Sequence, residues 1–404
     1  MIEKKGDSVK KILFVTHTLG GGGAENVLVN LLGRLSMDAS LDITLLSIVD
    51  TGIYRESLPK KIKYKSFIKN PFKFVNKKEK SGSLLIKTNI IVKLFIWIYT
   101  LFWRYVPART LHKIIIKDSY DYEVAFLEGI CAKVVSGGND NTKKYSWIHV
   151  DLLKQHKSKY IFSNINDERN VYLKFNNIIC VSEYVKQSFL KLFNMDDDGK
   201  VIVRYNPIDT NQIIKKAQNK LGDNNMGDDS SAFKICSIGR LNKQKQYIRL
   251  VKTMEYLHKK KINAVCYILG EGTDREYLQE YITSKKLESM VHLLGFIENP
   301  YPYLNKADLF VCSSIAEGFS TAVSEAVILG IPVVTTRCSG MDEILGESEY
   351  GLIVNNDEKD LCLGIEKMII DKNLYSRYKK AVKKRKTFFD YEKRCNEIRN
   401  MFFS

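Results

Sequence analysis

The sequence predicts an α/β protein built from two doubly wound domains, each with its own parallel sheet. Short apolar runs of strand length alternate with helix-like segments through most of the 404 residues. Such alternation is typical of a parallel sheet that is covered by helices on both faces. One polar segment, Lys215–Ala232, is rich in Gly, Asn and Asp and has the composition of a linker. The alternation starts again after it, which predicts a second domain.

Length and composition fit an ordinary globular protein. The chain is 45% hydrophobic and 27% charged, and its length suits two or three domains of ~100–200 residues each. We see no signal-peptide pattern, because the first residues are polar and precede a short strand. The eight cysteines are scattered and form no CxxC pair. We therefore expect reduced, buried thiols in a cytoplasmic protein.

The first domain is expected over residues 1–210. It begins with the apolar run KKILFVTHT, which ends at a cluster of glycines. The cluster opens a helix whose apolar residues, from Val27 to Leu35, recur at helical spacing. Further strands of this domain are expected at 41–49, 121–128, 144–150, 177–182 and 200–206.

The second domain is expected over residues 233–404, after a linker at 211–232. Its strands are expected at 233–239, 263–270, 290–296, 308–314, 331–336 and 350–354. Helical stretches separate these strands, and the chain from Glu358 onward is expected to be helical throughout.

The net charge of +17 is concentrated in one stretch. Between Arg55 and Lys117 there are 16 Lys or Arg and two acids, an excess of +14. Inside it, the apolar run Leu94–Trp103 is far shorter than the ~20 residues that span a bilayer. Aromatic and basic residues together suit a helix that lies in the membrane interface. A core helix with solvated lysines also explains the run, whereas no nucleic-acid-binding motif accompanies it.

Three turns that follow strands have residues suited to an anionic ligand. Gly20–Gly23, which includes Gly22 and Gly23, lies between a strand and a helix, where backbone N–H groups can bind an anion. Arg240 and Lys245 lie in one loop and could hold one diphosphate. Gly270 and Gly272 end the next strand. A flexible turn, a solvated basic loop and a capped turn are the respective alternatives without a ligand.

Two glutamates define a fourth place. Glu317 follows a strand, and Glu325 falls in the second turn of the helix that begins at Ser320 or Thr321. Glu325 shares its face with small apolar residues, so it needs a partner that carries hydroxyls or positive charge. A glycosidase pair is an alternative, with carboxyl groups ~5–5.5 Å apart if retaining and ~6.5–9.5 Å if inverting. The phosphate-type loops favour sugar chemistry with a diphosphate leaving group.

At these residues the chain resembles the family 4 glycosyltransferases of the GT-B fold, especially bacterial enzymes that build capsule, exopolysaccharide or O-antigen. That fold has two Rossmann-like domains that face each other across a cleft. The E-x7-E signature falls at Glu317 and Glu325, and GRLxxxK falls at Gly239–Lys245. Shorter matches are GGAE at Gly22–Glu25, FLEG at Phe126–Gly129, WIHVDL around His149, and NPID at Asn206–Asp209.

The resemblance implies roles for these positions. Arg240 and Lys245 would hold the donor diphosphate, Glu317 would lie by the donor sugar, and Glu325 would bond the nucleoside ribose. His149 would serve catalysis from the acceptor side, although a packed histidine is equally ordinary after a strand, and His17 is a weaker candidate. The remaining expected donor contacts are Gly22, Gly23, Gly270, Gly272, Phe296, Ile297, Gly318, Phe319, Ser320 and Thr321. One departure is Gln246, because the family usually has glycine after the lysine.

We therefore interpret the chain as a retaining glycosyltransferase that needs no metal and uses a UDP- or GDP-sugar. Asp196–Asp198 reads as a solvated loop and not as a metal site. The first domain would bind the acceptor, which we expect to be a polyprenyl-diphosphate-linked glycan at the cytoplasmic face of the plasma membrane. An enzyme acting on a protein or teichoic-acid acceptor is an alternative. So is a protein that binds nucleotide sugars or nucleic acid without catalysis.

Overall fold

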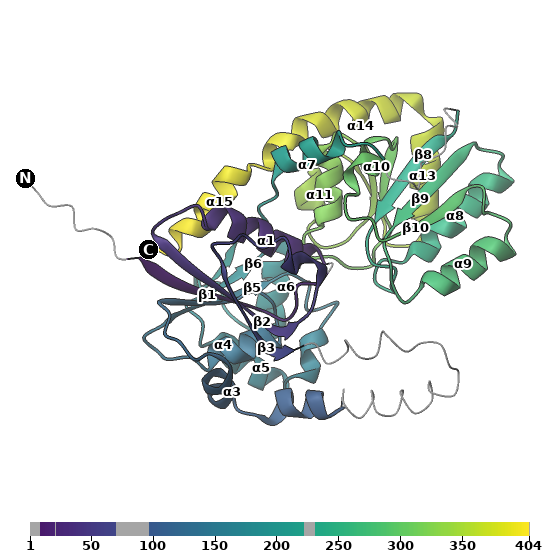
Figure 1. Cartoon of the computed structure of the whole chain (residues 1–404). Helices are drawn as coiled ribbons and strands as arrows, with labels where there is room; N and C mark the ends of the chain where they lie inside the picture. Colours follow the sequence, from purple (N-terminus) through teal and green to yellow (C-terminus); the bar gives the residue numbers. More distant parts are fainter. Residues whose placement is uncertain (1–8, 21, 70–96, 222–230, 404) are drawn as a thin grey trace, which may run out of the picture. The chain divides into compact units, whose positions relative to one another are not determined.

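The structure is a computed structural model that describes residues 9–20, 22–69, 97–221 and 231–403. The chain divides into two compact units, residues 1–206 with 394–404 and residues 207–393. Each unit contains one parallel sheet, and helices flank it (Figure 1). The predicted fold class is confirmed.

The first unit is built on a sheet of seven strands in the order β3-β2-β1-β4-β5-β6-β7, all parallel. The strands are β1 (Lys10–Thr16), β2 (Leu41–Asp50), β3 (Lys63–Lys69), β4 (Tyr122–Ala125), β5 (Lys143–Ile148), β6 (Asn177–Cys180) and β7 (Val201–Val203). The α-helices are α1 (Gly23–Leu35), α3 (Ala108–Ile115), α4 (Ile130–Ser136), α5 (Ile165–Tyr172) and α6 (Glu183–Phe193).

The second unit has six parallel strands in the order β10-β9-β8-β11-β12-β13. They are β8 (Phe233–Ile238), β9 (Ala264–Leu269), β10 (Val291–Gly295), β11 (Leu309–Cys312), β12 (Val333–Thr336) and β13 (Leu352–Val354). The helices are α7 (Thr210–Ala217), α8 (Tyr247–Lys259), α9 (Arg275–Ser284), α10 (Tyr301–Asn305), α11 (Thr321–Ile328), α12 (Met341–Leu345), α13 (Glu358–Ile370) and α14 (Lys372–Arg385).

Strand burial explains why the apolar runs form these sheets. The segments of β4 and β9 are buried at every position, as expected for central parallel strands that carry helices on both faces. Both strand orders also reverse at one place, between β1 and β4 in the first sheet and between β8 and β11 in the second. Ligands of open α/β sheets bind outside the carboxyl ends of the strands at such a reversal.

The carboxyl-terminal boundary differs from the expected one. Residues from Arg394 onward belong to the first unit, whereas the sequence assigned 233–404 to the second. The reason is packing. The Phe402 side chain is fully buried with its ring against those of Phe14 and Tyr122, and the Tyr145 hydroxyl donates to the Met401 carbonyl at 2.8 Å. Helix α15 (Tyr391–Asn400) carries the chain to this position.

The expected linker is only partly described. Helix α7 occupies Thr210–Ala217, so part of the segment 211–232 belongs to the second unit as a helix. Residues 222–230 lie outside the described part of the chain.

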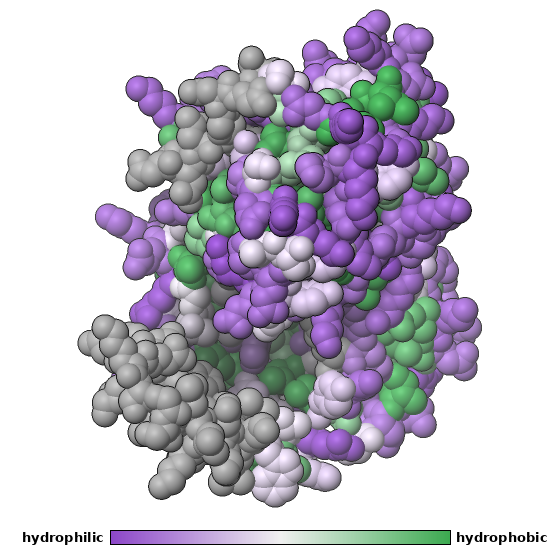
Figure 2. Space-filling view, turned by 90° about the vertical axis from the view of Figure 1, so that its right-hand side faces the viewer, coloured by the Kyte–Doolittle hydropathy of each residue, from purple (hydrophilic) through white to green (hydrophobic). Residues whose placement is uncertain are grey.

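Parts of the basic stretch, residues 55–117, belong to the fold of the first unit. It contributes β3 to the edge of the first sheet and helix α3 beside it. Part of it, residues 70–96, lies outside the described residues, and residues 97–105 are helical. Among the described helices, none is both long and apolar enough to cross a membrane. On the face drawn in Figure 2, hydrophilic side chains predominate and apolar ones form separate small groups.

The two tryptophans of the expected membrane helix have different surroundings. Trp97 is 60% exposed, whereas Trp103 is fully buried. The Trp103 ring packs against those of Phe67, Tyr99 and Phe102, at centroid distances of 6.5, 5.7 and 5.2 Å. The Trp103 ring is therefore part of the core of the first unit. The interpretation of Trp103 as a membrane-facing residue is wrong.

Candidate functional site

The main constellation lies at the strand-order reversal of the second sheet. Strand β8 ends at Ile238, and the loop that follows it carries Arg240 and Lys245. Strand β11 ends at Cys312, and its loop carries Glu317. Because β8 and β11 are neighbours, the carboxyl ends of both strands meet at the same edge of the sheet. This is the place where the fold predicts a ligand.

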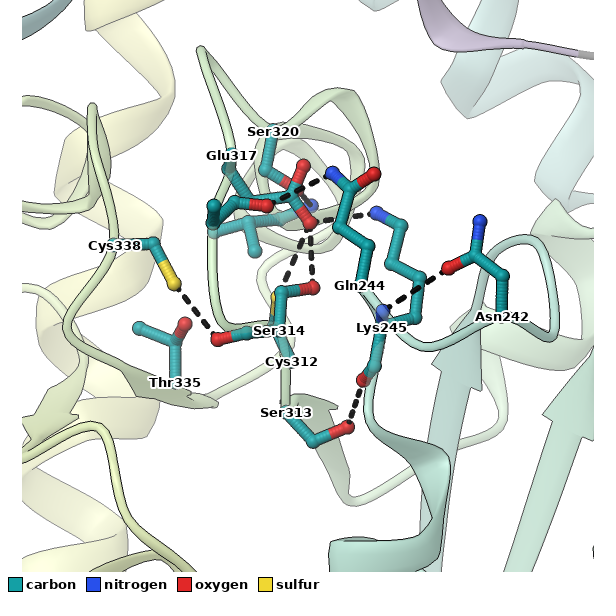
Figure 3. Close-up of polar contacts among 12 residues, drawn as sticks. Asn242, Gln244, Lys245, Cys312, Ser313, Ser314, Glu317, Ser320, Thr335 and Cys338 are labelled. Atoms are coloured by element: carbon teal, nitrogen blue, oxygen red, sulfur yellow. Dashed lines mark hydrogen bonds and ion pairs between the residues drawn. The ribbon is translucent and has the colours of Figure 1, made fainter. Parts of the chain in front are cut away.

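An ion pair joins the two loops. The Lys245 ammonium lies 2.6 Å from Glu317 Oε1, and the side chains are 20% and 10% exposed. Burial by itself lowers the pKa of Lys245, but the Glu317 carboxylate outweighs this effect and leaves the pKa raised above its ordinary value. Lys245 therefore stays charged at every physiological pH. Figure 3 shows the pair, with Glu317 facing the lysine and Ser314.

Further hydrogen bonds hold the loops in register. The Ser314 hydroxyl donates to the same Glu317 Oε1 at 2.6 Å. The Ser313 hydroxyl donates to the Lys245 carbonyl at 2.7 Å, and the Gln244 side-chain amide donates to the Ala316 carbonyl at 2.9 Å. One carboxyl oxygen of Glu317 is thus fully engaged. The other, Oε2, has no hydrogen bond among the described residues and is left for a ligand.

Arg240 stands apart from this network. Its side chain is exposed, and within the described residues no hydrogen bond or ion pair is formed by it. Two glycines after β9 pack closely against the backbone of the loop that carries Arg240. A Cβ at Gly270 would lie 1.9 Å from the Gly239 carbonyl oxygen, and one at Gly272 would lie 2.2 Å from that of Leu241. Close backbone approach therefore explains both glycines, and their expected contact with the donor stays a prediction.

Glu325 is buried at 7% exposure on helix α11. The Tyr301 hydroxyl donates to Glu325 Oε1 at 3.2 Å. Burial raises the pKa of Glu325 to about 7, although Tyr301 and the positive charge of Lys216 lower it. A buried carboxyl group whose ionised form is destabilised in this way is typical of a binding position. We expected Glu325 to have a partner that carries hydroxyls or positive charge. Tyr301 is such a partner, and the sequence did not predict it.

The start of α11 lies next to Glu317. The Ser320 hydroxyl accepts a bond from the Val323 N–H at 3.4 Å and caps the helix, as predicted. Phe319 is 6% exposed, so its ring packs inside the protein and any contact with a donor must come from its backbone. Gly318 is buried as well, and Thr321 is half-buried.

The expected base-contacting turn follows β10. Phe296 is 51% exposed, and Ile297 is half-buried. An exposed aromatic side chain beside a strand end is suited to stacking on a planar base. This role stays a prediction.

The expected residues of the first unit lie at its own strand-order reversal and after the next strand along the sheet. Gly22 precedes helix α1 and Gly23 begins it, after strand β1. His149 follows β5 and is 8% exposed. Burial lowers the pKa of His149 to about 4, against a hydrogen bond to the Phe126 backbone. The imidazole is therefore neutral, and its Nε2 is buried with no partner among the described residues.

Neither a second groove nor a metal site adds to this constellation in the described residues. A groove of about 670 Å³ lies at the opposite edge of the first sheet, beside the starts of β1, β4 and β5, away from the strand ends that carry the motifs. Among the described residues, no group of three or more His, Cys, Asp or Glu side chains is placed to hold a metal ion.

Comparison with known proteins found a family match over part of the chain and several relatives. Residues 223–385 match the family described as Glycosyl transferases group 1. The N-acetylgalactosamine-N,N'-diacetylbacillosaminyl-diphospho-undecaprenol 4-alpha-N-acetylgalactosaminyltransferase of Campylobacter jejuni is 36% identical over 193 residues, or 47% of this chain and 50% of that protein. An uncharacterized glycosyltransferase of Methanocaldococcus jannaschii is 26% identical over 317 residues, or 70% and 77% of the two chains.

The solved structures agree on the fold. The Anabaena protein HepE, in complex with UDP and glucose, has a TM-score of 0.71 at 20% sequence identity, over 97% of this chain and 99% of that chain. Residues 223–385 therefore match the group 1 glycosyltransferases, and the two parallel sheets have the GT-B fold of the solved structures. Both findings agree with the resemblance to family 4 and with the predicted fold.

Matched relatives are also named for bacterial surface glycans. They include an Escherichia coli O-antigen biosynthesis glycosyltransferase, 27% identical over 170 residues, and a Staphylococcus aureus capsular polysaccharide biosynthesis glycosyltransferase, 25% identical over 199 residues. The chain spans about half the length of the Campylobacter relative and of the capsular one.

Proposed function

We propose that this chain is a retaining glycosyltransferase that moves a sugar from a nucleoside-diphosphate sugar, with UDP as the first choice, to a glycan acceptor. The observation that carries the proposal is the Lys245–Glu317 ion pair at the strand-order reversal, with the exposed Arg240 in the same loop. Fixed positive charge at this place suits a diphosphate, and a carboxyl oxygen beside it suits the hydroxyls of the attached sugar. HepE, whose structure contains UDP and glucose, supports the choice of donor.

The proposed chemistry uses charge in place of a metal ion. The acceptor oxygen bonds to the anomeric carbon while that carbon's bond to the diphosphate breaks. The nucleoside diphosphate leaves with the bonding electrons and takes up the acceptor's proton. Lys245, Arg240 and the first N–H groups of α11 stabilise the negative charge that grows on the leaving group. Activity is therefore expected to persist in excess EDTA, and a loss that Mg²⁺ restores would contradict this mechanism.

The acceptor is proposed to be a lipid-linked glycan bound by the first unit. The Campylobacter relative, by its name, acts on a glycan carried by diphospho-undecaprenol, which supports this acceptor. Work on such a substrate would place the protein on the cytoplasmic face of the plasma membrane. Exposed apolar and basic residues of the first unit support this location. They are Trp97, Ile98, Tyr105, Arg109, Lys113 and Lys117.

Thermal stabilisation by nucleotides tests the donor assignment. UDP, GDP, ADP and their sugar conjugates are added to the purified chain and the unfolding midpoint is measured. A ligand present at 100 times its Kd stabilises the fold by about 2.7 kcal/mol. UDP conjugates are expected to raise the midpoint, and the Arg240→Ala, Lys245→Ala double variant is expected to lose the shift. Failure of every nucleotide sugar to bind, with no release of UDP from UDP-sugars, would contradict the proposal.

A matched control comes from helix α8. Lys252 is a half-buried lysine that pairs with Glu358 at 2.9 Å, away from the proposed diphosphate site. Lys252→Ala removes the same charge as Lys245→Ala, so it should leave the nucleotide-induced shift unchanged. If both variants lose the shift equally, net charge and not a built site is responsible for binding.

A further inference from the structure

Glu128 occupies the place in the first unit that Glu317 occupies in the second. It lies in the turn after β4, the strand that stands beside β1 where the strand order reverses. Glu317 lies in the loop after β11, the strand that stands beside β8 at the corresponding reversal. The fold therefore brings a carboxylate to the ligand-binding edge of each sheet. Only Glu317 has a function in the proposal above.

The contacts of Glu128 are all with backbone N–H groups. Its Oε1 accepts hydrogen bonds from the backbone N–H groups of His149 and Val150, the latter at 3.2 Å, and its carboxyl group also interacts with the N–H of Glu128 itself. The bonds to His149 and Val150 fix the turn after β5. Among the described residues, no other residue donates a hydrogen bond to Oε2. A glutamine could fix the turn equally well through its carbonyl oxygen, so the turn does not explain why the residue is a glutamate.

The surroundings of Glu128 also oppose its charge. Burial raises the pKa of Glu128 to about 7, and the nearby carboxylate of Glu168 adds to the effect. Within the described residues, no Lys, Arg or charged His pairs with Glu128. A partly buried carboxylate without a cation is costly unless a ligand engages it.

A second unsatisfied group lies beside it. The His149 ring bonds to the Phe126 backbone through one nitrogen, and its Nε2 is buried without a partner. The Phe126 and His149 rings lie 4.8 Å apart between centroids. In this tautomer Nε2 is an acceptor, as is Glu128 Oε2. Acceptors in the turns after two neighbouring strands, β4 and β5, disfavour a phosphate and suit a neutral ligand that donates hydrogen bonds.

We propose that Glu128 binds and orients a hydroxyl group of the acceptor sugar, with Oε2 as the hydrogen-bond acceptor and His149 next to it. The inference rests on the proposed function, because it assigns the acceptor to the first unit. It names the ligand class as a neutral, hydroxyl-bearing sugar and separates this subsite from the anion-binding loops of the second unit.

The decisive variant is Glu128→Gln, since it keeps an oxygen for the two backbone N–H groups and removes the carboxylate. The probes are methyl glycosides of glucose, galactose, N-acetylglucosamine and N-acetylgalactosamine, measured by saturation-transfer NMR in the presence of UDP. The wild-type chain is expected to bind at least one of them. Glu128→Gln is expected to bind that glycoside at least tenfold more weakly, with the Kd for UDP and the unfolding midpoint unchanged or improved.

Glu123→Gln provides the control. Glu123 is a buried carboxylate on β4, 2% exposed and paired with His112 at 2.9 Å. Its substitution should change stability but not glycoside binding. Equal glycoside binding by wild type and Glu128→Gln would overturn the inference, as would the absence of glycoside binding to the wild type. Neither result touches the donor site, whereas a failure of UDP to bind would count against the proposed function itself.

Discussion

The two units present a carboxylate at corresponding positions of their sheets, but they surround it with opposite neighbours. In the second unit, Oε1 of Glu317 accepts hydrogen bonds from both the Lys245 ammonium and the Ser314 hydroxyl. In the first, Glu128 holds only backbone N–H groups, with a neutral imidazole beside it. In the two proposals, one edge therefore binds an anion and the other a neutral hydroxyl. The same topology would then support two kinds of recognition, with the loop residues deciding between them.

The largest effect on catalysis should come from breaking the ion pair of the second unit. Glu317→Gln keeps the size of the side chain but removes the charge that positions Lys245 and bonds the donor sugar. We expect turnover to fall by about 100-fold, which corresponds to about 2.7 kcal/mol of transition-state stabilisation. UDP affinity should change little. Single-turnover kinetics together with calorimetry separate the two, and a large loss of UDP affinity at normal turnover would contradict the role.

The pH dependence of Glu325 sharpens the comparison inside the second unit. Its folded-state pKa of about 7 lies above the ordinary 4.5, so its contribution to stability is lost as pH rises from about 4.5 through 7. Glu325→Gln should therefore be more stable than wild type by about 1–3 kcal/mol at pH 8, and equally stable near pH 4. UDP should bind about tenfold more weakly, because the ribose loses a charged hydrogen-bond acceptor.

The distribution of tryptophan provides the readout. Trp97, Trp103 and Trp147 all belong to the first unit. Urea unfolding followed by circular dichroism should show the stabilisation by Glu325→Gln, while the tryptophan fluorescence transition should be unchanged if the units unfold independently. If Glu325→Gln is less stable than wild type at pH 8, the ionised Glu325 carboxylate does not destabilise the fold, which would contradict the prediction.

Membrane binding tests whether the charge of the first unit has a separate purpose. Arg109, Lys113 and Lys117 are exposed, whereas Lys63 and Lys65 already pair with Asp42 and Asp118. Each basic residue near an anionic surface contributes about 1 kcal/mol. Reversing these three charges should therefore weaken binding to vesicles rich in anionic lipid by at least 100-fold.

The control for this prediction lies on α14, where Lys380, Lys383 and Lys384 are also exposed. Reversing those charges changes the net charge equally but should leave vesicle binding largely intact. Trp97→Ser should remove the part of the binding that resists high salt. Equal partition of wild type onto neutral and anionic vesicles would contradict the membrane proposal.

The smallest expected effect concerns the departure from the family pattern. Gln246 has φ 50° and ψ 41°, a left-handed conformation, and its side chain donates to the Lys243 carbonyl at 2.7 Å. Gln246→Ala loses that bond and keeps the strain, whereas Gln246→Gly relieves the strain. The glycine variant should be the more stable of the two by about 1 kcal/mol. Urea titrations can show this, and a more stable alanine variant would contradict the assignment.

The proposed donor site could be predicted from the sequence because its residues lie in short motifs. Arg240, Lys245, Glu317 and Glu325 fall at fixed spacings after apolar strands, and neighbouring parallel strands bring such residues to one edge. Ser314 and Tyr301, which hold Glu317 and Glu325, were not predicted. Neither a serine next to another serine nor a tyrosine at the start of a five-residue helix has a periodic signal. Ser314 lies three residues before Glu317, so its proximity to that loop was the one available indication.

The amino-acid sequence by itself determined the two α/β units, the resemblance to the glycosyltransferases and the positions of the loops proposed to bind an anion. These follow from local information: the alternation of apolar runs, the glycine turns and the spacing of charged residues. Only the tertiary structure decided that the end of the chain packs in the first unit, that Trp103 belongs to its core, and that the Glu128 carboxyl group bonds to the backbone of His149, whose ring has a nitrogen without a partner among the described residues. Each of these depends on contacts between residues far apart in the chain, and no local pattern of a single sequence encodes which distant surfaces meet.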